Sequence, residues 1–71
     1  MNHQDPDILA RYIAARQALD DAAMAGDQAA FEVAKRPCAD ATQDYVDDLE
    51  RIGFTAPHGL REEIANLRRR P

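Results

Sequence analysis

The sequence predicts an all-α protein: an antiparallel helical hairpin with a long, proline-kinked second helix, followed by a short third helix, in one small bundle. Two long stretches of the 71-residue chain repeat hydrophobic residues every three or four positions, which is the period of a helix and not of a strand. Gly26 and Asp27 separate these stretches, and so short a connection forces two helices to lie antiparallel. A third hydrophobic stripe near the C-terminus predicts the short helix.

The first helix is expected at residues 5–25, after a frayed start at residues 1–4. Asp5 is a typical N-cap, Pro6 suits the first helical position, and Asp7 places negative charge at the positive end of the helix dipole. Gly26 suits a left-handed cap that ends the helix. One face carries hydrophobic side chains at helical spacing, namely Ile8, Tyr12, Ala15, Leu19 and Ala22.

The second helix is expected at residues 27–52, with Asp27 as its cap. Its hydrophobic seam spans an arc of only about 80°, and consists of Phe31, Ala34, Cys38, Ala41, Tyr45, Leu49 and Ile52. Pro37 removes the amide that would bond to Val33, which predicts a kink or a break. Because the seam keeps its phase and Arg36 is a poor N-cap, we favour a kinked continuous helix over two helices meeting at Arg36.

The two seams are complementary in size when positions are paired about the turn so that their numbers sum to 53. This rule pairs Ala22 with Phe31, Leu19 with Ala34, Ala15 with Cys38, Tyr12 with Ala41, and Ile8 with Tyr45. In every pair but the last, a large residue faces a small one, which fills the space between facing helices evenly. The pattern predicts the interface of the hairpin.

The third helix is expected at residues 56–69. Gly53 suits the end of the second helix. Pro57 suits the first turn of the third, with Thr55 or Ala56 as its cap. Its hydrophobic stripe consists of Leu60, Ile64 and Leu67. We expect this stripe to fold back over Leu49, Ile52 and Phe54, and we consider Leu9 and Ile13 of the first helix as further contacts.

Composition limits the class of protein. The chain is long enough for one domain with a small core. Because a small core contributes little stability, we consider self-association, which would bury more apolar surface. The single cysteine, Cys38, has no partner for an internal disulfide, which suits a reducing compartment. Its position on the hydrophobic seam predicts a core residue. No apolar run reaches the ~18 residues of a membrane span, and the polar start lacks a signal-peptide core. We therefore predict a cytoplasmic protein without a membrane segment, and the Ala-, Arg- and Asp-rich, serine-free composition favours a bacterial, plasmid or phage gene.

The sequence contains no pattern that predicts an enzyme. There is no serine nucleophile, His3 and His58 are isolated, and the three glycines are too dispersed to form a phosphate loop. A di-iron bundle would need Glu-x-x-His pairs, and none is present. We therefore predict no catalytic residue, metal or cofactor.

Two sets of charged residues on the second helix are candidates for binding another protein. An acidic ridge consists of Asp40, Asp44, Asp47 and Asp48. The simplest interpretation is a solvated face, but like charges four apart slightly destabilise a helix, so a basic partner surface would relieve them. Lys35 and Arg36 supply basic charge on the same helix.

These charges also suggest a homodimer. An antiparallel second subunit crossing near Ala41 and Thr42 would bring Lys35 to Asp48 and Arg36 to Asp47 in an isologous contact. The flank available for this contact consists of Val33, Thr42 and Val46.

The only sequence feature that favours nucleic acid is the arginine-rich end, which consists of Arg61, Arg68, Arg69 and Arg70. Residues 1–67 carry six basic and thirteen acidic side chains, and a net-acidic body binds phosphate poorly. Cations at a helix C-terminus are explained more simply by the helix dipole. We therefore predict a non-enzymatic module that binds a protein partner or itself, with a nucleic-acid-binding regulator as the alternative.

Overall fold

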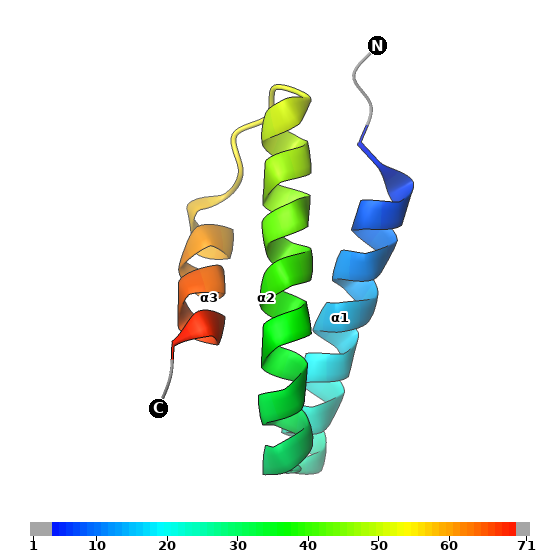
Figure 1. Ribbon diagram of the computed structural model, residues 1–71, viewed down its shortest axis with the longest axis vertical. Helices are drawn as coiled ribbons and strands as arrows, with labels where there is room; N and C mark the ends of the chain where they lie inside the picture. Colours follow the sequence, from blue (N-terminus) through cyan, green and yellow to red (C-terminus); the bar gives the residue numbers. More distant parts are fainter. Residues whose placement is uncertain (1–3, 70–71) are drawn as a thin grey trace.

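The computed structural model describes residues 4–69, and all of its regular structure is helical. The three helices are α1 (Pro6–Ala25), α2 (Gln28–Arg51) and α3 (His58–Arg68), and no strand occurs in the described residues. Figure 1 shows α2 in the middle, with α1 and α3 on either side. The predicted all-α class is confirmed. Of the start predicted to be frayed, Gln4 is not helical, and residues 1–3 lie outside the described part.

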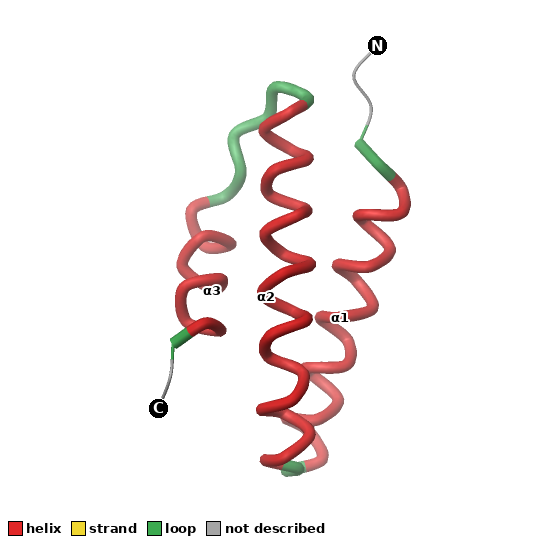
Figure 2. The backbone as a smooth tube through the Cα atoms, viewed as in Figure 1, coloured by secondary structure: helices red, strands yellow, loops and turns green. Residues whose placement is uncertain are grey.

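The predicted caps of α1 and α2 are present. The Asp5 side chain accepts a hydrogen bond from the Asp7 amide at 2.9 Å, and Asp27 accepts one from the Ala30 amide at 3.0 Å. Gly26 has φ 69°, in the left-handed region, and its amide returns to the last carbonyls of α1. These contacts produce a very short turn between α1 and α2, in contrast to the longer loop before α3 (Figure 2).

The start of α3 differs from the prediction. Neither Thr55 nor Ala56 caps it; Pro57 occupies the N-cap position with φ −56° and ψ 137°, without a side-chain cap hydrogen bond. A residue before proline is biased toward extended conformations, which keeps Ala56 out of the helix. Ala56 is instead buried in the core, 5% exposed.

Helix α2 is continuous through Pro37, so the alternative of two helices meeting at Arg36 does not occur. Pro37 is exposed, and Val33, whose carbonyl loses its helical partner, is 76% exposed. Water can therefore satisfy that carbonyl at little cost. One turn later the Thr42 hydroxyl donates to the Cys38 carbonyl at 2.7 Å, a bond that often bends helices. The kink at Pro37 stays a prediction.

Helix α2 packs against both other helices, whereas the backbones of α1 and α3 do not touch each other within residues 4–69. Between α1 and α2, the rings of Tyr12 and Tyr45 stack with their centroids 4.5 Å apart and their planes 6° from parallel. The predicted pairing sets Tyr12 opposite Ala41 and misses this stack. Side chains lean toward the N-terminus of their own helix, so on helices running in opposite directions two rings about one turn apart lean toward each other.

The core lies mainly between α2 and α3. Val46, Ala56 and Ile64 form its buried cluster, with Leu49 and Leu60 packed against it. On α2, Cys38, Ala39 and Thr42 are fully buried. The expectation that Phe54 lies under α3 is wrong, because its side chain is 64% exposed. It follows Gly53, whose φ of 93° turns the chain at the end of α2.

Candidate interaction surface

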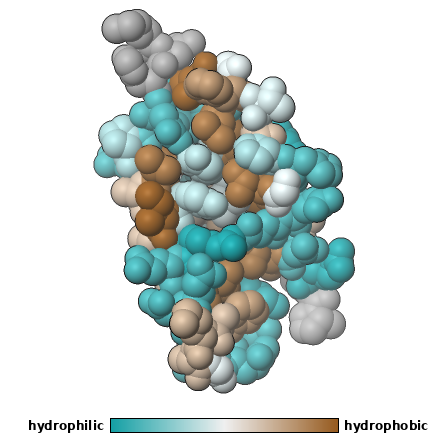
Figure 3. All heavy atoms as spheres, turned by 180° about the vertical axis from the view of Figure 1, so that it is seen from behind, coloured by the Kyte–Doolittle hydropathy of each residue, from teal (hydrophilic) through white to brown (hydrophobic). Residues whose placement is uncertain are grey.

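The chain leaves much of its hydrophobic surface uncovered. Of the sixteen larger apolar side chains within residues 4–69, only Leu19, Val46 and Ile64 are buried. Four are exposed, namely Ile13 at 53%, Met24 at 89%, Val33 at 76% and Phe54 at 64%. Figure 3 shows one face of the molecule, where hydrophobic surface lies above and below a hydrophilic band. Hydrophobic contact with another surface is therefore available on several elements.

A pocket of about 290 Å³ opens between α1 and α2 beside Pro37, and we call it the Pro37 pocket. Its apolar lining consists of Ile8, Ala15, Pro37 and Ala41. Its charged lining consists of Arg11, Asp40 and Asp44. An apolar floor with two carboxylates suits an apolar group carried next to a positive charge.

The predicted acidic ridge is not one solvated face. Asp40 lies 3.4 Å from the Arg68 guanidinium of α3, and Asp47 accepts a hydrogen bond from Gln43 at 3.0 Å. Asp44 is exposed and makes no hydrogen bond or ion pair within residues 4–69. Each predicted carboxylate therefore has a different environment, and Asp44 is the one left open to a partner.

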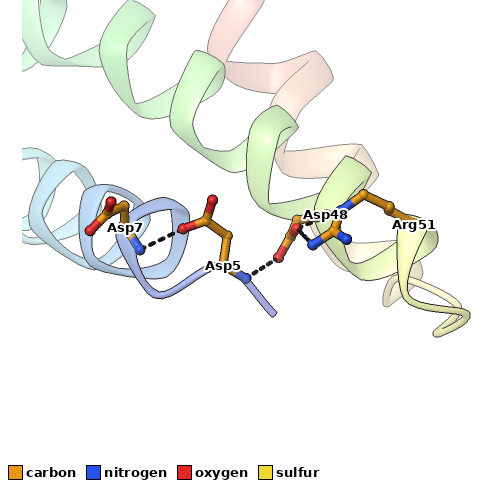
Figure 4. A network of polar contacts seen from close by, with 4 residues as sticks. All are labelled: Asp5, Asp7, Asp48 and Arg51. Atoms are coloured by element: carbon orange, nitrogen blue, oxygen red, sulfur yellow. Dashed lines mark hydrogen bonds and ion pairs between the residues drawn. The ribbon is translucent and has the colours of Figure 1, made fainter. Parts of the chain in front are cut away.

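The prediction that Asp48 belongs to an exposed acidic ridge is wrong, because its side chain is only 1% exposed. The Asp5 amide donates to its Oδ2 at 2.9 Å, and Arg51 donates to its Oδ1 at 3.1 and 2.5 Å (Figure 4). The Arg51 hydrogen bond, supported by the Asp5 amide, lowers the pKa of Asp48 and outweighs the opposing effect of burial. This carboxylate ties the start of α1 to the end of α2.

A signal for this contact existed in the sequence. The rule that facing positions sum to 53 pairs Asp48 with Asp5. Two carboxylates repel each other, so the pairing rule by itself does not predict a contact here. The structure resolves the conflict, because Asp48 accepts from the backbone amide of Asp5 and not from its side chain.

The two basic residues predicted to bind a partner, Lys35 and Arg36, also differ in their environments. Lys35 lies 3.2 Å from Glu32 and 5.3 Å from the centre of the Phe31 ring. Arg36 is exposed and has no hydrogen bond or ion pair within the described residues. The dimer contact predicted across Thr42 is wrong as drawn, because Thr42, Val46 and Asp48 are buried within one chain.

The arginine-rich end is partly engaged with carboxylates. Arg68 pairs with Asp40, and Arg61 lies 2.5 Å from Glu50 of α2. A further ion pair joins Arg16 of α1 to Glu63 of α3. Arg69 is exposed, and Arg70 lies outside the described residues. The pairs at Arg61 and Arg68 anchor α3 to α2.

Comparison with protein-family models, curated proteins and solved structures finds no match. Within residues 4–69, no group of three or more His, Cys, Asp or Glu side chains is arranged to hold a metal ion. In the same residues, no helix combines the length and apolar character needed to span a bilayer.

Two side chains with reactive chemistry occupy ordinary structural positions. Cys38 is a free thiol with no exposed surface. His58 is 84% exposed and lies 3.1 Å from Glu62, one turn later on the same helix. What the surface offers instead is exposed hydrophobic area, an apolar pocket, and two opposite charges on α2 that have no partner within residues 4–69.

Proposed function

We propose that this chain is a helical association module that works without catalysis, by binding a second copy of itself or a partner protein. The single observation that carries the proposal is the burial pattern: three large apolar side chains are buried and four are largely exposed. Burying one such side chain contributes about 1.5–3 kcal/mol. Association is therefore favourable wherever two or more of them become covered together.

The scaffold that we infer for this role is a hairpin of α1 and α2, bent at Pro37 and braced by α3. In this arrangement α2 is the best element to present to a partner, because it contacts both neighbours and still exposes Val33, Arg36 and Asp44. We propose an accessory or regulatory role in the cytoplasm of a bacterium, or in a plasmid or phage system. Composition supports this setting.

Sedimentation equilibrium of the full chain tests the proposal. We expect a reversible increase in mass between about 5 and about 500 µM, with a thermal midpoint that rises over the same range because association stabilises the folded state. A strictly monomeric chain with a concentration-independent midpoint would rule out self-association.

The nucleic-acid alternative has weaker support. Arg61 and Arg68 already pair with carboxylates, which phosphate would have to displace. A mobility shift that weakens with salt and is lost when Arg68, Arg69 and Arg70 become alanine would favour this alternative over protein association.

A further inference from the structure

We infer that α2 binds α2 of a second copy in an antiparallel two-fold contact centred beside Pro37, with Arg36 of each copy on Asp44 of the other. The inference rests on the proposed function and specifies its surface. It differs from the contact predicted across Thr42, because every residue that it uses is exposed or lines the Pro37 pocket.

The first support is the pattern of charges on α2. Seven of its nine charged side chains have a hydrogen-bonding or ion-pair partner within residues 4–69, namely Glu32, Lys35, Asp40, Asp47, Asp48, Glu50 and Arg51. The two without a partner, Arg36 and Asp44, have opposite signs. They are eight residues apart, about 12 Å along the helix, which is too far for them to pair with each other. A two-fold axis between them would pair both at once.

The second support is the position of that axis. Side chains on antiparallel helices meet when they lean toward each other, as Tyr12 and Tyr45 do. The same lean applied to Arg36 and Asp44 places the axis at about position 38. Pro37 is the exposed residue next to it. The same lean brings the Asp40 side chains of the two copies together at the axis, where each lies 3.4 Å from Arg68 of its own chain, which reduces the repulsion between the two carboxylates.

The third support is the Pro37 pocket. In this register Arg36 reaches the pocket of the second copy at Asp44, whereas Val33, three residues earlier, lies opposite Asp47, outside the pocket. The pocket has apolar lining at Pro37 and Ala41. Asp44 belongs both to the pocket and to the proposed pair. The second copy thus supplies a cation, Arg36, to a carboxylate of the pocket.

The experiment uses charge reversal on the full chain. Arg36→Glu and Asp44→Arg are each expected to raise the dimer dissociation constant at least about tenfold, because each variant creates two like-charge contacts across the axis. An equimolar mixture of the two variants is expected to associate as tightly as the unmodified chain. In the mixture each substituted side chain faces an opposite charge on the other variant. Sedimentation equilibrium measures all three samples, and circular dichroism checks that each is helical.

Asp21→Arg is the matched control, because it makes the same charge change at an exposed position of α1 that also lacks a partner within residues 4–69. It is expected to leave association unchanged. Variants that dimerise like the unmodified chain, or a mixture that stays monomeric, would overturn the Pro37 contact and leave association through another surface intact. A monomeric unmodified chain would remove both the contact and self-association.

Discussion

At the scale of single residues, neighbouring aspartates of α2 differ because their positions around the helix differ. Asp48 points toward α1 and is held by the Asp5 amide and Arg51, whereas Asp47 is exposed and bonds only to Gln43 within residues 4–69. Removing the Asp48 carboxylate therefore removes one link between α1 and α2, whereas removing the Asp47 carboxylate does not. The two positions form a natural pair for measurement.

Asp48→Ala is expected to lower the thermal midpoint at pH 7 clearly more than Asp47→Ala. The folded-state pKa of Asp48 lies below its value in the unfolded chain, so its contribution is fully present above about pH 4 and is lost as pH falls further. The difference between the variants should therefore shrink below about pH 4. Thermal melts of both variants across this range provide the measurement. Equal midpoints at pH 7 would contradict the buried network.

At the scale of elements, α2 tolerates a proline because of where the proline lies. Pro37 and Val33 are exposed, so the carbonyl that loses its partner can bind water, and the helix continues to Arg51. The N-caps at Asp5 and Asp27 fix where α1 and α2 begin. Local features of this kind explain the helix limits without reference to the rest of the fold.

Pro37→Ala is expected to stabilise the single chain by about 1–3 kcal/mol, because alanine restores the hydrogen bond to Val33 and removes the helix-interior cost of proline. Urea unfolding at low concentration, where association does not contribute, measures the change. A loss of stability would instead mean that the predicted bend at Pro37 is needed for packing against α1.

At the scale of the whole molecule, α2 is the element through which the other two are joined. Helices α1 and α3 both pack on α2 and reach each other through the Arg16–Glu63 ion pair. The cluster of Val46, Ala56 and Ile64 holds α3 in place. Because this core is small, a single buried side chain carries a large share of the stability.

Ile64→Ala is expected to destabilise the chain by about 2–4 kcal/mol, because it removes a side chain from this small core. Ile64 is 6% exposed, whereas Phe54, in the loop between α2 and α3, is 64% exposed. Phe54→Ala should change the unfolding free energy of the monomer by less than about 1 kcal/mol. Urea denaturation of both variants distinguishes a docked α3 from a loosely held one, for which the two changes would be similar.

The sequence by itself determined the helical class and the beginnings of α1 and α2, because caps, proline positions and hydrophobic period depend on residues within about four positions of one another. It failed at Ala56, which is buried in the core and does not cap α3, and at Asp48, which accepts a hydrogen bond from a backbone amide 43 residues away. Only the tertiary structure decided which charged side chains gained a partner and which, such as Arg36 and Asp44, have none within residues 4–69. Desolvation depends on what packs across from a residue, and that is not a property of its local sequence.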